Sequence, residues 1–481
     1  MKPVVMGVLI SAASMLGMSG CTLGPDFHTP ANALGAHWRQ PDTAASQSRA
    51  VPGAVDNQWW QGFADAQLSA LLADAQANNL DLRVAASHVE QSVAARATVA
   101  ADRLPGVGAA GDYSRARNSE RGLMDISGND GKANYNVWNA GLNFNWEADL
   151  WGRVRRSVEA ADANVQVSLE EQHGAMVSIM AQVARDYIQL RGTQNSLEVT
   201  RQNLDIARHS LALTRARLGQ GVATDLEVSQ SAALVAAIDA RVPALQQQQN
   251  VLINALSFLV GREPGALSRE LSPLKAIPAG PANVPVGLPS ELAQRRPDIR
   301  RAEADLHAAT AAIGVAKADF YPRITLSGSA GFQATQLSDL GSWGSRAFAF
   351  GPGLSVPIFE GGRLQGQLQL RESRQQEAGI AYQRTVLAAW HEVDNALSGY
   401  QADQRRHQSL ELAVRESRHA LASAQEQYAQ GTVDFLNVLT VQKALLADQA
   451  ALVQSTADVS LTLVSLYQAL GGGWQQQAAV R

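Results

Sequence analysis

Few motifs in this chain of 481 residues have the residue types and spacing that chemistry would need. Gly106-Val-Gly-Ala-Ala-Gly111 has the spacing of a dinucleotide fingerprint, but it follows a helical pattern and Pro105 rather than a strand. His391-Glu392 lacks the second histidine of a zinc-protease helix, because Asn395 occupies that position. The sequence also contains no P-loop and no nucleophile elbow. We therefore predict that the protein is not an enzyme and holds no cofactor or metal.

The start of the chain carries a signal for export and lipidation. Lys2 precedes an apolar run from Val4 to Met18 that is too short to remain as a spanning helix. Met18-Ser19-Gly20-Cys21 is similar to a bacterial lipobox, in which Cys21 would carry a covalent lipid and become the mature N-terminus. The alternative is an ordinary signal peptide with a cysteine beside its cleavage site by chance. Cys21 is the only cysteine, so no internal disulfide can form.

Composition limits the partners. A net charge of −4 at pH 7 argues against a nucleic-acid partner, which would favour a basic surface. No run of eighteen apolar residues occurs after Cys21. If the chain spans a membrane, it must therefore do so with strands.

The chain repeats itself. Asp81-Leu-Arg83 recurs as Asp298-Ile-Arg300, and Gln220-Gly221 recurs as Gln430-Gly431. Such self-similarity predicts an internal duplication, with one structural unit per copy. The expected segments are a signal (1–20), a lipidated tether (21–65), a first repeat (66–261), a proline-rich linker without helix (262–290), a second repeat (291–471) and a tail (472–481).

Each repeat contains the pattern of one very long helix. The first runs from Arg153 to Gln220 without proline, and a helix of about 67 residues is roughly 100 Å long. An apolar residue recurs at every seventh position, at Met176, Val183, Leu190, Leu197, Leu204, Leu211 and Leu218. The second repeat keeps this seam in Val386, Val393, Tyr400, Val414, Leu421 and Tyr428, with one lapse at His407. The second seam position, occupied by Gln194, Arg201 and Arg208, predicts a polar flank that faces water.

The long helices are expected to form hairpins with exposed tips. Gly221 and Gly431 can adopt a positive φ and so reverse the chain. A single returning helix should follow each turn, from Asp225 to about Val260 and from Asp434 to about Leu470.

Strands are expected in two pairs, one in each repeat. They cover residues 105–117 and 135–146 in the first repeat, and 323–332 and 347–356 in the second. Alternating residues with aromatics near the ends are typical of lipid-facing barrel strands, although two edge hairpins of a soluble protein would give a similar pattern. Four strands cannot close a barrel in lipid, so several copies of the chain would have to share one.

Several segments in this order resemble the lipoprotein branch of the outer-membrane channel family of tripartite efflux systems. They are Cys21-Thr-Leu-Gly-Pro-Asp26, Asp149-Leu-Trp-Gly-Arg153, Arg295-Arg-Pro-Asp-Ile-Arg300, Ala318-Asp-Phe-Tyr-Pro322, Val356-Pro-Ile-Phe-Glu-Gly-Gly-Arg363 and Tyr428-Ala-Gln-Gly-Thr432. The resemblance implies an α+β membrane protein: a homotrimer with a twelve-stranded β-barrel, four strands per chain, continuous with a periplasmic α-helical coiled-coil barrel. It also implies a periplasmic adaptor and an inner-membrane RND pump as partners.

The resemblance also implies a periplasmic gate at the hairpin tips, formed by Glu227, Tyr428 and Asp434, and less strongly by Asp225. Three copies of an acidic residue at a narrow neck would repel one another and attract cations. The alternative is that Asp225 and Asp434 simply cap helices whose dipoles favour acids at the start. The arginine that some members carry at this tip is Val433 here, so a gate locked by that arginine is doubtful.

The two turns are the expected adaptor contacts, and a plain solvated turn is the alternative. The residues concerned are Gly219, Gln220, Gly221 and Val222 in the first turn, and Gln430, Gly431, Thr432 and Val433 in the second.

The sequence thus predicts a passive outer-membrane exit duct for small toxic compounds, driven by the pump. The alternatives are a duct for protein secretion and a periplasmic coiled-coil scaffold lipoprotein without a pore. The exported compounds are not encoded in the chain.

Overall fold

The computed structural model describes residues 22–31, 38, 49–51, 53, 55–119 and 134–475. Cys21, the predicted signal and most of the predicted tail lie outside these residues. The chain forms two compact units, one of residues 1–30, 89–168 and 302–382, and the other of residues 31–88, 169–301 and 383–481. Four of the five boundaries between the units fall within helices of the chain, and the boundary at 30/31 does not.

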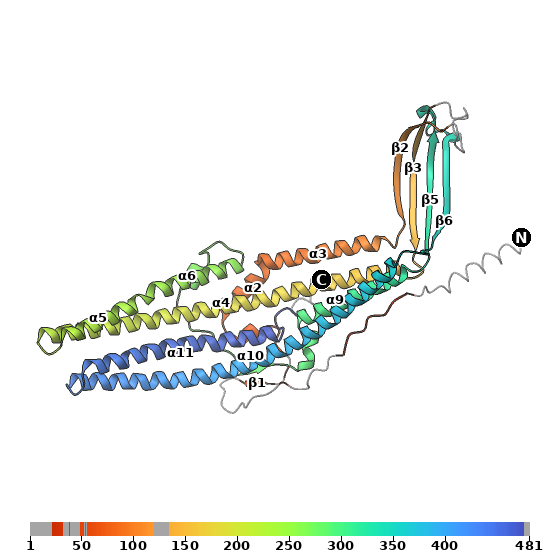
Figure 1. Cartoon of the computed structure of the whole chain (residues 1–481). Helices are drawn as coiled ribbons and strands as arrows, with labels where there is room; N and C mark the ends of the chain where they lie inside the picture. The colour runs from red at the N-terminus through yellow and green to blue at the C-terminus, as the bar shows by residue number, and fades with distance from the viewer. Residues whose placement is uncertain are drawn as a thin grey trace. The chain divides into compact units, whose positions relative to one another are not determined.

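The first unit contains a four-stranded antiparallel sheet (Figure 1). Its strands, in spatial order, are β2 (Gly106–Ala116), β3 (Tyr135–Ala148), β5 (Arg323–Ala334) and β6 (Arg346–Ser355). The short 3-10 helices η3 (Leu337–Asp339) and η4 (Trp343–Ser345) lie between β5 and β6. The two predicted strand pairs are confirmed. The glycine motif at 106–111 is the first half of β2, so it is not a phosphate-binding loop.

The register gives the sheet one apolar and one polar face. On one face Phe144 pairs with Val107 and Gly328, and Phe350 pairs with Gly328 from the other side. Neighbouring positions on the strands point to the opposite face, where Asn143 lies between Gly108 and Ser329. Large apolar side chains of the first face are exposed, namely Val107, Leu142, Leu326, Phe332, Phe348, Phe350 and Leu354.

The two repeats meet in this sheet along β3 and β5, where two glycines are required by space. Gly141 pairs directly with Gly331. A Cβ on Gly331 would lie 2.4 Å from the Ala140 carbonyl oxygen, and one on Gly141 would lie 2.8 Å from that of Ala330. The close approach of the strands at this point therefore depends on both glycines.

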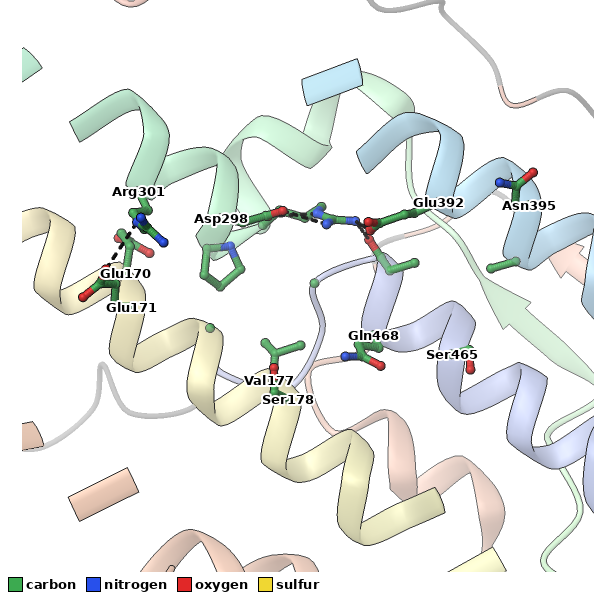
Figure 2. Close-up of a pocket in the computed structure, with 16 residues that line it drawn as sticks. Glu170, Glu171, Val177, Ser178, Asp298, Arg301, Glu392, Asn395, Ser465 and Gln468 are labelled. Carbon is green, nitrogen blue, oxygen red and sulfur yellow. Dashed lines mark hydrogen bonds and ion pairs between the residues drawn. The ribbon is translucent and has the colours of Figure 1, made fainter. Parts of the chain in front are cut away.

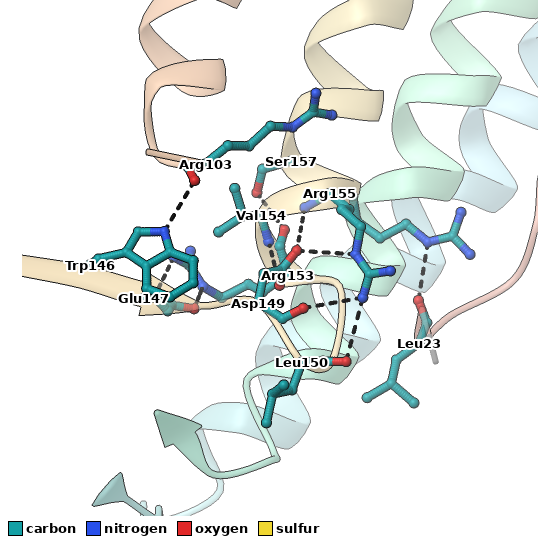
Figure 3. Close-up of polar contacts among 11 residues, drawn as sticks. Leu23, Arg103, Trp146, Glu147, Asp149, Leu150, Arg153, Val154, Arg155 and Ser157 are labelled. Carbon is teal, nitrogen blue, oxygen red and sulfur yellow. Dashed lines mark hydrogen bonds and ion pairs between the residues drawn. The ribbon is translucent and has the colours of Figure 1, made fainter. Parts of the chain in front are cut away.

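The connection from β3 into the next helix is fixed by polar contacts (Figure 3). Arg153 donates two hydrogen bonds of 2.8 Å to the Glu147 carboxylate. Asp149 accepts hydrogen bonds from the backbone N–H groups of Val154 (3.1 Å) and Arg155 (2.8 Å), so it occupies free donors at the helix start. The segment Asp149-Leu-Trp-Gly-Arg153 thus has a structural role at the strand–helix junction.

Four helices contribute residues to both units: α3 (Leu80–Ala101), α4 (Arg153–Gly219), α9 (Pro297–Ala318) and α10 (Arg363–Ala429). The second unit also contains β1 (Arg49–Val51), η1 (Trp59–Phe63), α2 (Ala66–Asn78), α5 (Asp225–Asp239), α6 (Arg241–Leu259), α7 (Ser268–Leu271), β4 (Asn283–Pro285), η2 (Pro289–Glu291), α8 (Leu292–Arg295) and α11 (Phe435–Ala469). Among the described helices, none has a stretch both long and apolar enough to cross a bilayer.

Most positions of the two heptad seams are buried, and Met176 and Leu218 near the ends of the first seam are partly exposed. Val183, Leu190 and Leu197 on α4, and Val393, Tyr400 and Val414 on α10, are all at most 5% exposed. His407 is the partly buried lapse in the second seam, and its Nε2 lies 3.4 Å from Glu411 Oε1. The prediction for Gln194 is wrong, because this side chain is buried and donates to the carbonyl oxygens of Leu271 and Ser272.

Two predictions about helix continuity need correction. The first returning helix is broken at Ala240 into α5 and α6. Pro243 lacks the N–H that would bond to the Asp239 carbonyl oxygen, and its ring crowds that oxygen. The proline-rich linker does contain a helix, the single turn α7, which fits between Pro264 and Pro273.

The expected tether also has structure of its own where it is described. Strand β1 pairs with β4 of the linker, and η1 buries Trp59, Trp60 and Phe63. Trp59 stacks on Tyr467 of α11 with ring centroids 5.2 Å apart. The core of the second unit therefore includes Trp38, Val55, Trp59, Trp60 and Phe63 of this segment.

A buried arginine holds the linker against α4. Arg191 is fully buried and donates to the carbonyl oxygens of Leu271 (3.2 Å) and Pro273 (2.9 Å) and to Gln67 Oε1 (2.6 Å). Its guanidinium also lies over the ring of Tyr187, 4.8 Å from the centroid. Burial raises the pKa of Tyr187 to about 12. These contacts satisfy linker carbonyl groups that the loop itself leaves unpaired.

Candidate functional site

Both helical hairpins end in turns of the same construction (Figure 1). Gly221 has a φ of 74° and Gly431 a φ of 75°, in the left-handed region that favours glycine. In the first turn Val222 N donates to Arg217 O at 2.9 Å, and in the second Thr432 N donates to Gln427 O at 3.0 Å. These bonds satisfy carbonyl groups at the helix ends in the Schellman pattern.

The turns expose most of the residues predicted to contact an adaptor. Residues 219–222 and 430–432 are exposed, and Val222 is 64% exposed. Val433 is only partly exposed, because it packs against the apolar core between the hairpins. The exposed surface of the two turns therefore consists of glycine backbone, two glutamines, Thr432 and Val222, and none of these side chains is charged.

The acidic residues near the turns are tied to the helix starts. Glu227 forms a capping box: its carboxylate accepts a hydrogen bond of 2.6 Å from the Thr224 N–H, and the Thr224 hydroxyl accepts one from the Glu227 N–H. Asp434 is the N-cap of α11 and accepts from the Asn437 N–H at 3.1 Å. Asp225 is exposed in the first turn of α5 and is not the cap. Capping therefore involves two of the three acids, and it leaves their charge in place.

Tyr428 lies in the core that joins the two hairpins. Its side chain is 8% exposed, and its ring lies 5.4 Å from that of Phe435. The core draws apolar residues from all four helices, namely Leu204 and Ala207 (α4), Leu234 and Ile238 (α5), Val414, Leu421 and Tyr428 (α10), and Phe435, Val438, Leu439 and Leu445 (α11). We refer to these eleven residues as the tip core. Displacement of either hairpin tip would have to disrupt it.

Arg217 of the first hairpin covers Tyr428 of the second. Its guanidinium carbon lies 4.3 Å from the centroid of the Tyr428 ring, and its Nη1 donates to the Tyr428 carbonyl oxygen at 3.4 Å. Burial raises the pKa of Tyr428, the Arg217 charge opposes this rise, and the Glu227 charge adds to it. The structure therefore brings Tyr428 and Glu227 within electrostatic reach of each other. Within the described ranges, no group of side chains suitable for holding a metal ion gathers here or elsewhere.

A separate cavity of about 720 Å³ lies within the second unit (Figure 2). Its acidic side chains are paired. Glu392 and Asp298 each lie 2.7 Å from Arg296, and Glu170 of α4 lies 2.7 Å from Arg300. Glu171 lies 3.4 Å from Arg301. The segment 295–300 thus uses its arginines to connect α4, α9 and α10. This pairing gives the segment a structural role.

Comparison with known proteins assigns the chain. The family described as outer membrane efflux protein matches residues 71–262 and 288–472. The chain belongs to the outer membrane efflux protein family. Outer membrane protein OprJ of Pseudomonas aeruginosa is 33% identical over 470 residues, which cover 96% of this chain and 95% of that protein. The probable efflux pump outer membrane protein TtgC of Pseudomonas putida is 33% identical over 473 residues, which cover 98% of this chain and 96% of that protein.

A solved structure supports the same assignment. The outer-membrane channel OprN is 34% identical, with a TM-score of 0.88 over 95% of this chain and 100% of that chain. This outer membrane efflux protein accordingly resides in the outer membrane, where it is an efflux duct. Members of the family are transport proteins rather than enzymes.

For this efflux protein, sequence reasoning located the tips but missed Arg217. Its only local signal was a basic residue in the last turn of α4, where it favours the helix dipole. The contact with Tyr428 joins residues 211 positions apart, and no local pattern encodes it.

Proposed function

We propose that three copies of this chain form one duct, in which their sheets close a twelve-stranded β-barrel and their helices form a periplasmic tunnel. The duct is passive, and an inner-membrane RND pump supplies the energy through a periplasmic adaptor. Cys21 carries a lipid that anchors each chain to the outer membrane.

The exposed apolar face of the sheet carries the proposal. Phe348 is 78% exposed and Phe350 69% exposed, and the large side chains around them share one face. The opposite face carries Asn, Ser, Thr and Gly. Such alternation suits a strand between lipid and an aqueous lumen.

The edges of the sheet support the trimer. Strands β2 and β6 each have a neighbour on one side only within the described sheet. A sheet edge inside lipid leaves backbone groups unpaired, at a cost of several kcal/mol for each group. Pairing β6 of one copy with β2 of the next would remove both edges, and three copies would supply twelve strands.

The tips support a gate that is closed at rest. Glu227 lies within electrostatic reach of Tyr428, and Asp434 caps α11 beside the second turn. Threefold symmetry would repeat each acid three times around one axis. Like charges at a narrow neck attract cations and resist dense packing. Arg217 adds a contact that fastens Tyr428 to the neighbouring hairpin.

Planar-bilayer conductance tests the duct and its gate together. Glu227→Gln and Asp434→Asn remove the charges but keep the caps, because Gln serves at the third position of a capping box and Asn is as good an N-cap as Asp. We expect the purified double variant to lose the cation preference of the parent, because the ring of negative charges is gone. If neither protein ever opens a pore, the duct proposal fails.

Thr224→Ala provides the matched control, because it removes the cap and leaves both charges. It should lower stability by about 1 kcal/mol without changing ion selectivity. An equal loss of selectivity in this variant would assign the role of Glu227 to capping alone.

Single-cysteine crosslinking tests the adaptor contact. Lipidation would block the Cys21 thiol, so Val222→Cys would provide the only reactive thiol. We expect it to crosslink to the cognate adaptor in cells, whereas Arg215→Cys, exposed on α4 above the turn, should not. Equal crosslinking at both positions would show that the tip is not the specific contact with the adaptor.

The cargo follows from the named relatives. TtgC of Pseudomonas putida is named as a component of an efflux pump, and others are named for toluene or solvent efflux. We propose small toxic compounds as the cargo of this chain.

A further inference from the structure

Gln442 on α11 is a buried polar residue without a hydrogen-bond partner. Its side chain is 2% exposed, and neither Oε1 nor Nε2 has a partner in the part of the chain that the structure describes. Buried amides are almost always hydrogen-bonded, because leaving water without a new partner is costly. Gln442 therefore needs an explanation.

The surroundings of Gln442 are apolar. On the helix its neighbours three and four positions away include Val438, Leu439 and Leu445, all members of the tip core. Phe435, which contacts Tyr428, lies seven residues earlier on the same face, about 10 Å along the helix. The unpaired amide thus lies two turns along α11 from Phe435, the residue that packs against the proposed gate residue Tyr428.

A neighbouring copy of the chain is a poor source of the missing partner. The Gln442 side chain is enclosed by its own chain, so it offers almost no surface to another molecule. A movement of α11 away from the other helices would instead bring water to the amide. A gate at the tips that opens by displacing α11 would make this movement.

We propose that Gln442 is a positioning residue of the gate. This role rests on the proposed gating function. Its unpaired amide weakens the packing of α11 in the tip core when the tips are closed. In the displaced state the amide is hydrated, and this cost disappears. Gln442 therefore reduces the free-energy difference between the closed and the open state, whereas an apolar residue at this position would favour the closed state.

Gln442→Leu and Gln442→Met test the proposal on the full-length, lipidated protein in planar bilayers. Both remove the amide and keep a side chain of similar size. We expect the fraction of time spent open to fall about tenfold in each, the effect of one unsatisfied amide on an equilibrium. Gln454→Leu is the control, because Gln454 is exposed on the same helix and its amide already has a partner, Asp458.

Three outcomes are informative. A tenfold fall in both variants with no change in the control supports the proposal. Higher thermal stability with unchanged opening shows a merely structural role and overturns it. If the parent and the Glu227→Gln, Asp434→Asn variant also never conduct, the duct proposal itself fails, and that result is distinct from the second.

Discussion

The two helical hairpins come from matching parts of the two repeats, but they differ in where regular structure or hydrogen bonding is interrupted. The first hairpin consists of α4, α5 and α6, and the second of α10 and α11. The first hairpin is broken in its backbone at Ala240. The second has an unbroken returning helix, but its two helices contain buried polar atoms without partners, on Gln401, His407, Gln442, Gln449 and Ser455. Among the described residues of the first hairpin, only Arg191 Nε is such an atom.

This difference suggests a division of roles between the hairpins. Arg191 of the first hairpin is tied to the linker, whereas Gln401, which is 210 positions on, leaves its Oε1 unpaired. Polar atoms without partners lower the cost of separating the helices that enclose them. We infer that the second hairpin is the easier one to displace, and the following substitutions test that inference.

Exchanging the helix break should have the largest effect. Val453 is the counterpart of Pro243, and Val453→Pro would remove a helix bond and crowd the Gln449 carbonyl, at a cost of about 3 kcal/mol or more. Pro243→Val should lower the free energy of unfolding far less. It should also slow amide hydrogen exchange around Ala240, because it allows one continuous helix. Thermal unfolding and hydrogen exchange measure the two effects. Unchanged exchange near Ala240 would show that Pro243 is not the cause of the break.

Arg191→Gln would give the first hairpin the residue of the second. We expect the free energy of unfolding to fall by about 2–3 kcal/mol, because the Pro273 carbonyl loses its donor and the Leu271 carbonyl keeps only the bond from Gln194. Denaturant unfolding measures the loss. Arg201→Gln, an exposed site on the same helix, is the control, and an equal loss there would contradict a specific role for the buried guanidinium.

Arg217→Gln would remove the contact that joins the two tips. A cation–π contact at an exposed site stabilises by about 0.5–1 kcal/mol, so opening should become roughly two- to fivefold more frequent. Bilayer recordings measure this change. Arg215→Gln removes an exposed charge two residues away, and it should leave opening unchanged. An identical increase in both variants would assign the effect to net charge alone.

The smallest expected effect is a pH dependence. The folded protein raises the pKa of Tyr428 above its ordinary value of 10.0, chiefly by burial. The folded state therefore holds this proton more firmly than the unfolded state, so the stabilisation is full below pH 10 and is lost as the pH rises through the folded pKa. Opening should increase at alkaline pH in the parent and less so in Tyr428→Phe. The same alkaline response in both proteins would exclude Tyr428 as the titrating group.

Much of the fold follows from local patterns. The alternation of residues located all four strands of the sheet, and the heptad repeat located α4 and α10. These features depend on neighbours within one or two turns of the chain, so a single sequence contains them. The linker was harder, because its prolines concealed α7, a single turn that fits between them.

The candidate site divides in the same way. The positions of Gly221, Gly431 and the cap Asp434 could be read from the sequence, because a turn needs a residue that adopts positive φ and a helix start needs an acceptor. Glu227 was located too, but its partnership with Thr224 emerged only from the structure. Arg217 was missed.

By itself, the sequence determined which segments are strands, long helices and turns, and that the chain is duplicated. Only the tertiary structure decided that Arg217 covers Tyr428, that Arg191 holds the linker and that Gln442 is buried without a partner. The physical reason is that periodicity reports which face of an element is apolar. It does not report which distant residue meets that face, and hydrogen bonding and charge depend on that distant residue.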